Sequence, residues 1–447
     1  MPNTLLIIGA GVDRTNGIDF PLANTLLSAI SNYAENEGQE VDQKLRKFLP
    51  NLRFTFSSII TQAIEKITTR DISEQRHMIE RLQQVTDTIG EDNVVKKHGE
   101  LLVKLFNKLV VITQNAELDD DIESLIREVF ADRANDYLSS DSIVDIHKMS
   151  LSDTFKAVLK ATLRLSLKGE NNEIAQALGS EMLNIENLLI EKFLGFYNHR
   201  QSDIKNYIYI SWMMWAYLVH TEKKVKTRLE EENRQVPFYS SIPQNIDIKA
   251  ITLNYTSFIE DQLTKENVIY FHGGLSEYVN MTNRTYMDID NYQNFDINDF
   301  IDNCVEPNIH ISDNETELQK HVIPALVPPL KLKPVLSSKY IEKWHEAASW
   351  IKEAEKIIII GYSFSSADDH FNDIIRQNYA GKRIYIIAPD VDSPRSLSNF
   401  QQIFSCPIEG WTCGQIQGKK RMSLGNISLI KACADEITDS VEKTLLQ

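Results

Sequence analysis

Five short runs rich in aliphatic residues constrain the fold of this chain more than any other feature. One lies near the first residue and four lie in the second half of the chain: residues 5–8, 248–253, 268–271, 357–360 and 384–387. Short apolar runs of this kind are typical of buried strands in a parallel sheet. Strands that alternate with helices therefore predict an α/β protein with a Rossmann-like parallel sheet, whose ligands bind at the carboxyl ends of the strands.

The region between the first two runs has a different character. Glycine and proline are scarce there and apolar residues follow helical spacing, so residues 31–247 are predicted to form a large, mainly helical insert. The core is then residues 1–30 plus 248–447. Two helical faces illustrate the pattern: Leu102, Leu105, Phe106 and Leu109, and Met182, Ile185, Leu189, Phe193 and Phe196. Such faces pack on one another, and any surplus apolar surface serves a homo-oligomer interface.

Charge and composition exclude several classes of protein. A net charge of −16 argues against nucleic-acid binding, because phosphate neutralisation needs clustered Lys and Arg. The basic run at residues 419–421 is interpreted as a surface loop, with contact to a phosphate as the alternative. No run approaches the roughly 20 apolar residues that span a bilayer, and the apolar start lacks the basic lead-in of an export signal. We therefore expect a cytoplasmic protein that does not bind membranes.

The four cysteines form no CxxC pair, so neither a zinc ribbon nor a disulfide framework is indicated. They are Cys304, Cys406, Cys413 and Cys433.

Chemically useful residues follow four of the apolar runs directly. They are Gly9-Ala10-Gly11, Asn254, His272-Gly273 and Gly361-Tyr362-Ser363. Glycines after a strand let backbone amides approach a diphosphate, an amide side chain fixes a hydroxyl or a water, and a histidine accepts a proton near neutral pH. Each signal has an ordinary structural alternative. The glycines are equally compatible with a plain turn, Asn254 with a turn residue, and His272 with a packed core histidine.

Several of these motifs together resemble sirtuins. The segment Gly9-Ala10-Gly11-Val12-Asp13-Arg14 with Gly17-Ile18 is similar to the glycine-rich opening of that family. Leu253-Asn254-Tyr255 is similar to its asparagine-containing strand end, and Phe271-His272-Gly273 to its catalytic His-Gly pair. Three further features resemble a bacterial branch found in antiphage defence proteins: Val327-Pro328-Pro329, Trp344, and Gly361-Tyr362-Ser363-Phe364 with Asp368. The resemblance covers residues 1–30 and 248–390.

The resemblance implies a sirtuin-type core that takes NAD as substrate. Asn254 and His272 are then the catalytic pair, whereas Gly9, Ala10, Gly11, Arg14, Gly361 and Ser363 hold the dinucleotide. Asp368 is expected to cap a helix, and Tyr362 either stacks on a base or packs between strand and loop.

Three departures from the family narrow the expected activity. The four-cysteine zinc module of sirtuin deacylases is absent, so no zinc is expected, and Asp13 and Ala388 replace the usual serine and asparagine. Without the module the acyl-lysine groove is lost, which leaves hydrolysis of NAD to ADP-ribose and nicotinamide as the leading prediction. The resemblance implies a gated toxic effector of antiphage defence, possible partners being further copies of the chain or a HerA-type hexameric ATPase.

Two other functions remain open. One is a module that binds NAD or ADP-ribose without turnover, and the other is a protein deacylase or ADP-ribosyltransferase. The polar stretch from Tyr278 to Asn314 is predicted to be a long, partly mobile excursion.

Overall fold

The computed structural model describes most of the sheet-forming part of the chain and parts of the region before it. The described residues are 4–21, 23–56, 58–59, 62, 72–90, 94–111, 120–130, 154–159, 161, 174, 192, 200–243, 248–289, 292–312, 320–328, 333, 335, 337–405, 407, 410–416 and 418–437. The chain divides into two compact units. One comprises residues 1–26, 33–52 and 193–447, and the other residues 27–32 and 53–192.

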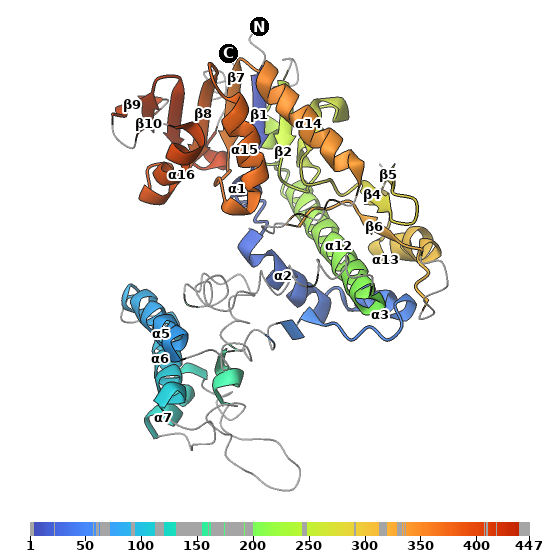
Figure 1. Ribbon diagram of the computed structural model, residues 1–447, viewed down its shortest axis with the longest axis vertical. Helices are drawn as coiled ribbons and strands as arrows, with labels where there is room; N and C mark the ends of the chain where they lie inside the picture. The colour runs from blue at the N-terminus through green and yellow to red at the C-terminus, as the bar shows by residue number, and fades with distance from the viewer. Residues whose placement is uncertain are drawn as a thin grey trace. The chain divides into compact units, whose positions relative to one another are not determined.

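The first unit is built on an eight-stranded sheet of order β3-β2-β1-β7-β8-β11-β10-β9 (Figure 1). From β3 to β11 every neighbouring pair is parallel, and only the last two pairings, β11 with β10 and β10 with β9, are antiparallel. Its strands are β1 (Thr4–Ile8), β2 (Ile248–Thr252), β3 (Val268–Tyr270), β7 (Lys356–Ile360), β8 (Arg383–Ala388), β9 (Thr412–Ile416), β10 (Lys419–Leu424) and β11 (Ile427–Lys431).

The five aliphatic runs form β1, β2, β3, β7 and β8, which confirms the predicted parallel α/β sheet. The register places the strand ends level, with Ile8 opposite Thr252 on one side and Ile360 on the other. The interpretation of residues 419–421 as a loop is wrong. They open β10, where Lys419 pairs with Glu436 and Lys420 pairs with Asp392, so salt bridges compensate charges that lie in a strand.

Three helices cover one face of the sheet: α14 (Ser338–Glu353), α15 (Asp369–Asn378) and α16 (Pro394–Phe404) (Figure 1). Their apolar sides form one core with the alternate residues of the strands. Members of that core on the helices include Trp350, Phe371 and Phe400, and members on the strands include Ile7 and Ile359. Helix α14 starts where Ser337 accepts a hydrogen bond from the amide of Lys339 and so caps the helix.

A second, antiparallel sheet of order β5-β4-β6 packs against the long helix α12 (Gln201–Glu231). Its strands are β4 (Glu277–Asn280), β5 (Thr285–Asp288) and β6 (Val322–Pro324). The indoles of Trp212 and Trp215 donate to the carbonyls of Val322 and Leu275, at 3.0 and 2.9 Å. Both indoles are buried.

The stretch from Tyr278 to Asn314 is therefore not one continuous excursion. Its described residues form most of β4, all of β5 and four helical segments, among them α13 (Ile297–Phe300) and the π-helical turn η8 (Ile301–Val305). The ring of Phe300 stacks on Trp215, with the ring centroids 4.8 Å apart. Buried aromatic contacts of this kind order a segment whose polar composition reads as a loop.

The described part of the second unit contains α5 (Ile72–Asp87), α6 (Val94–Val111) and α7 (Asp120–Phe130). Helix α6 contacts both α5 and α7. Its predicted apolar face is confirmed at Leu102, Leu105 and Phe106, which are buried. The five residues of the second predicted face (Met182, Ile185, Leu189, Phe193 and Phe196) lie outside the described residues. The insert boundaries, 31–247, remain a prediction.

The remaining helical elements lie outside the two sheets and the helices described above. They are α1 (Ala10–Asp13), α2 (Ala23–Glu35), α3 (Gln39–Phe48), η4 (Tyr239–Ser241), η5 (Phe258–Asp261), η6 (Lys265–Asn267), η7 (Tyr292–Asn294), η9 (Glu306–Asn308), η10 (Ser366–Asp368) and η11 (Ala434–Glu436). Among the helices described here, none is both long and apolar enough to cross a lipid bilayer.

Candidate active site

The predicted site residues gather at the carboxyl edge of four neighbouring strands. In the order β3-β2-β1-β7 these strands are followed by His272, Asn254, the glycine turn at Gly9 and the turn at Gly361. Backbone hydrogen bonds continue past the strand ends and hold the four turns together. Leu253 N donates to Ile8 O at 2.9 Å, and Gly9 N donates to Ile360 O at 2.9 Å.

The two glycine turns pack directly on each other. A Cβ atom at Gly9 would lie 2.5 Å from Gly361 O, and one at Gly361 would lie 2.5 Å from Val12 N. Gly361 also has a φ of +63°, a left-handed conformation that favours glycine. Close contact between two backbones therefore explains these glycines.

This packing also engages the amides that the sequence analysis assigned to a diphosphate. Gly9 N is bonded to Ile360 O, and Gly11 N donates to Gly361 O at 2.8 Å. Ala10 begins α1 and is exposed, and its N–H has no acceptor within the described chain. Arg14 and Ser363 are exposed on the same two turns. Of the predicted dinucleotide contacts, Ala10, Arg14 and Ser363 thus lie open to a ligand.

Asn254 is buried at the end of β2, with 5% of its surface exposed. Its Nδ2 donates to Gly9 O at 3.2 Å and contacts the hydroxyl of Tyr239 at 3.3 Å. Its backbone N–H donates to Thr252 Oγ1 at 3.1 Å. These contacts fix both the main chain and the side chain of Asn254.

Asp13 lies behind Asn254 in a fully buried polar cluster. Its Oδ1 accepts from Tyr239 Oη at 2.5 Å and its Oδ2 accepts from Thr256 Oγ1 at 2.7 Å. Burial raises the pKa of Asp13 from 3.8 to about 6, and the hydrogen bonds from Thr256 and Tyr239 offset part of that rise. The negative charge of Glu222 on α12 raises the pKa of Asp13 further.

His272 is buried at the end of β3, with 3% of its surface exposed. Its Nδ1 lies 3.3 Å from the carbonyl oxygen of Leu253, the residue before Asn254. Its Nε2 lies 3.3 Å from Asp368 Oδ1, which also accepts from Lys333 Nζ at 3.0 Å. The two candidate catalytic residues are therefore linked through one peptide of the β2 end.

The electrostatics of this group favour a neutral histidine. Burial lowers the pKa of His272, Asp368 partly opposes that shift, and Lys333 adds to it. Burial alone would raise the pKa of Asp368, but His272 and Lys333 hold it well below its usual range. His370 lies beside His272, with the ring centroids 5.8 Å apart, and burial lowers its pKa to about 4.

This geometry corrects the expected role of Asp368 and decides between the two alternatives for Tyr362. Asp368 precedes α15 but its carboxylate makes no capping hydrogen bond, because it faces His272 and Lys333 instead. Tyr362 packs as a core residue: its hydroxyl donates to Asn372 Oδ1 at 2.6 Å and its ring lies against Phe364. Burial of the Tyr362 ring leaves no face for a nucleotide base.

Sequence reasoning missed Tyr239, Thr256 and Lys333. Tyr239 and Lys333 follow no predicted strand and belong to no motif, so nothing local marks them. Thr256 lies two residues after Asn254, and that proximity was a usable signal.

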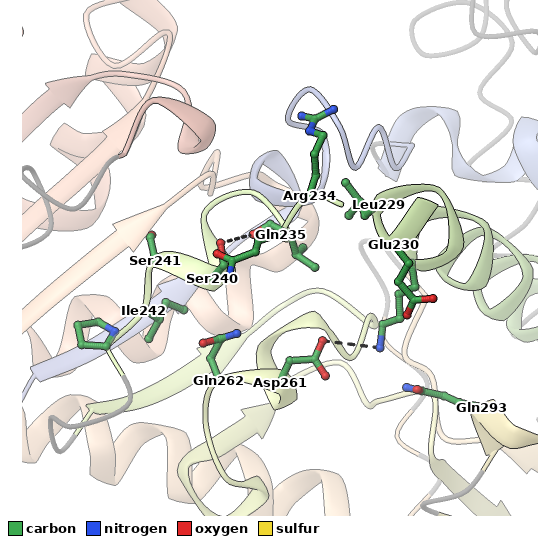
Figure 2. Close-up of a pocket in the computed structure, with 13 residues that line it drawn as sticks. Leu229, Glu230, Arg234, Gln235, Ser240, Ser241, Ile242, Asp261, Gln262 and Gln293 are labelled. Atoms are coloured by element: carbon green, nitrogen blue, oxygen red, sulfur yellow. Dashed lines mark hydrogen bonds and ion pairs between the residues drawn. The ribbon is translucent and has the colours of Figure 1, made fainter. Parts of the chain in front are cut away.

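An open, polar cavity of about 800 Å³ lies elsewhere in the first unit (Figure 2). It is lined by the C-terminal end of α12, the segment 234–243 and η5, and does not include Asn254 or His272. The dashed line at Asp261 in Figure 2 is its ion pair with Lys226, at 3.9 Å. Its acidic and basic residues are mixed, which gives no preference for an anionic ligand.

Within the described chain, no three His, Cys, Asp or Glu side chains are grouped so that they could hold a metal ion. Cys304, Cys413 and Cys433 are free thiols, and Cys406 lies outside the described residues.

Comparison with known proteins gives structural matches only. No protein-family model matches the chain, and no curated protein matches it. One similar solved structure is a mutant Sir2 homologue in complex with 2′-O-acetyl ADP-ribose, at 16% identity, with 56% of this chain and 76% of that chain covered and a TM-score of 0.31. Another is a complex of a Sir2 homologue with NAD, at 17% identity, with 56% and 74% covered and a TM-score of 0.28.

Proposed function

We propose that this protein hydrolyses NAD to ADP-ribose and nicotinamide at the carboxyl edge of its parallel sheet. The observation that carries the proposal is the pairing of Asn254 and His272 at the ends of β2 and β3, joined through the Leu253 carbonyl. The motif resemblance to sirtuins supplies the substrate. The exposed Ala10, Arg14 and Ser363 on the two neighbouring turns are the groups that would contact the dinucleotide.

The reaction breaks one bond and forms one. The bond between ribose C1′ and the nicotinamide nitrogen breaks, and its electron pair leaves with nicotinamide, which becomes neutral. The oxygen of a water molecule then bonds to C1′ of the oxocarbenium-like sugar. The water gives up one proton, so NAD and water yield ADP-ribose, nicotinamide and a proton.

His272 is the acceptor for that proton. Its lowered pKa keeps it neutral at pH 7, which is the form that accepts a proton. The carbonyl of Leu253 accepts from Nδ1 in the tautomer that leaves the lone pair on Nε2. In this tautomer the Nε2 lone pair faces the Asp368 carboxylate, which accepts a hydrogen bond from Nε2 and stabilises the imidazole once the ring is charged. Asn254 positions the attacking water, because its amide is held rigidly by Gly9 and Tyr239.

The burial of this pair supports a gated activity. Only 5% of Asn254 and 3% of His272 is exposed, so NAD reaches them after the covering residues move. Unregulated loss of NAD would kill the host, and assembly with further copies or with a partner protein is the proposed trigger. A HerA-type ATPase partner and a role in antiphage defence follow from the sirtuin resemblance alone.

The test is nicotinamide release from NAD by the full chain, alone and with the product of its neighbouring gene. We expect Asn254→Ala and His272→Ala to lower turnover by roughly 10²-fold or more, the usual range for a positioning group and a general base. Asn303→Ala and His345→Ala are matched controls, because both side chains are exposed. Their turnover should equal that of the natural sequence.

Three outcomes would replace the proposal. Assembled protein that binds NAD without releasing nicotinamide is a binding module. Turnover that survives both Asn254→Ala and His272→Ala places the chemistry elsewhere. Transfer of ADP-ribose to protein, in place of free ADP-ribose, would indicate a transferase.

A further inference from the structure

The orientation of the Asn254 amide follows from its neighbours. The carbonyl of Gly9 can only accept a hydrogen bond, so the atom 3.2 Å from it must be Nδ2. The second Nδ2 hydrogen then points to Tyr239 Oη at 3.3 Å. Both donor hydrogens of the amide are engaged inside the protein, and its Oδ1 accepts no hydrogen bond from the described residues.

Tyr239 links the Asn254 amide to Asp13 by a second hydrogen bond. Because Tyr239 Oη accepts from Asn254, its own hydrogen is free to donate, and Asp13 Oδ1 lies 2.5 Å away to receive it. Burial and the nearby Asp13 raise the pKa of Tyr239 well above 10, so the hydroxyl keeps its proton. The chain of donation runs from Asn254 to Tyr239 to Asp13, and each member is at most 5% exposed.

We infer that Asp13 and Tyr239 are positioning residues that hold Asn254 with Oδ1, an acceptor, toward the reacting water. An acceptor at this place binds a water hydrogen and turns the water's lone pair to the sugar carbon, whereas an amide donor would engage that lone pair. The inference rests on the proposed hydrolysis of NAD and specifies how its Asn254 acts. It also gives a physical reason for aspartate at position 13.

We call the hydrogen-bonded chain from Asn254 through Tyr239 to Asp13 the relay. It is stronger when Asp13 is ionised, because hydrogen bonds to a charged acceptor are stronger than those to a neutral one. The groups that face the Asp13 carboxylate are Tyr239 on η4, Thr256 and Asn254 after β2, and Glu222 on α12. Lys226 lies 3.4 Å from Glu222 and partly neutralises it. Protonation of Asp13 near pH 6 should therefore weaken the hold on Asn254.

Three substitutions give three different signatures. Tyr239→Phe removes the acceptor of Nδ2, so we expect kcat to fall about 10²-fold with KM changed less than about threefold. Asp13→Asn mimics the protonated acid: kcat falls about 10-fold at pH 7.5, and the loss of activity near pH 6 disappears. Thr256→Val removes a hydrogen bond that lowers the pKa of Asp13. In this variant we therefore expect the loss of activity to occur at a higher pH.

A readout independent of turnover is the ¹⁵N side-chain amide signal of Asn254, identified by its absence in Asn254→Asp. In the natural sequence we expect it to titrate with a midpoint near pH 6, and in Asp13→Asn to stay constant. Because this titration is measured on the unsubstituted protein, it tests the proposal even if the variants fail to fold.

The two proposals fail separately. If the assembled protein never releases nicotinamide, hydrolysis is wrong, and the titration of the Asn254 signal still decides the relay. If turnover is present but Tyr239→Phe is as active as the natural sequence, or the Asn254 signal does not titrate, the relay is wrong and hydrolysis stands.

Discussion

Replacing Asp13 by asparagine removes a buried negative charge from the carboxyl edge of the sheet. We expect this change to alter how the stability of the first unit depends on pH. Burial raises the pKa of Asp13, so the folded protein takes up a proton more readily at this carboxyl than the unfolded chain does. The ionised carboxylate therefore costs stability above pH 6, and the cost is relieved as pH falls toward 4.

The magnitude follows from the two pKa values. The shift from 3.8 to about 6 is about 2.2 units, and at about 1.4 kcal/mol per unit it costs about 3 kcal/mol at pH 7.5. At pH 5 the folded carboxyl is mostly protonated and the cost falls to about 1.5 kcal/mol. The side-chain amide introduced by Asp13→Asn does not titrate. The free energy of unfolding of this variant therefore lacks the pH-dependent cost of a buried carboxylate at position 13.

The assay is equilibrium unfolding in urea followed by tryptophan fluorescence at pH 7.5 and pH 5. All five tryptophans (Trp212, Trp215, Trp344, Trp350 and Trp411) lie in the first unit, so the signal reports on the unit that holds Asp13. The free energy of unfolding of the natural sequence, relative to Asp13→Asn, should rise by about 1.5 kcal/mol on going to pH 5. No change, or a fall, would refute a raised pKa at Asp13.

Further predictions concern the glycine turn and the histidine. Gly361→Ala should destabilise the first unit by about 2–5 kcal/mol, because its Cβ would meet Val12 N at 2.5 Å in addition to the cost of a positive φ; thermal unfolding measures this. Gly381→Ala is the control, with a φ of +78° and open space, and should cost only about 1–2 kcal/mol, so equal losses would contradict the packing argument. Asp368→Asn removes the carboxylate that raises the pKa of His272, so the histidine should titrate at lower pH in an NMR titration, and an unchanged or higher midpoint would contradict the contact.

The parallel part of the sheet was predictable because burial on both faces leaves a plain sequence signal. Strands β1 and β7 each hold four consecutive aliphatic residues after a first polar residue, and each is buried throughout. Strands β9 and β10 give no such signal, since most of their residues are partly or fully exposed and charged side chains occur in β10. Exposure at the edge of a sheet removes the hydrophobic pattern on which prediction depends.

The smaller sheet was hidden for another reason. Strand β5 has no buried residue, and it is ordered by pairing with β4, whose Tyr278 stacks on Trp212 of α12. That partner lies more than sixty residues earlier in the chain. The local composition of β4 and β5 therefore predicts a polar loop. The contact with α12, which is distant in sequence, is what stabilises the sheet.

Some residues of the candidate site could be predicted from the sequence, and others could not. Asn254 and His272 lie two residues after the ends of neighbouring strands β2 and β3, so their common edge is implied by the sheet. Asp13, Tyr239 and Asp368 are brought to them by turns whose course depends on packing. The burial that raises the pKa of Asp13 and the contact between His272 Nε2 and Asp368 are likewise properties of the folded chain.

The most direct test of the central claim is product analysis after incubation of the assembled protein with NAD in H₂¹⁸O. Hydrolysis predicts equal amounts of nicotinamide and ADP-ribose, with one ¹⁸O atom at the ribose C1′ carbon, and loss of both products in His272→Ala. Nicotinamide without free ADP-ribose, or no nicotinamide from protein that binds NAD, would contradict the account.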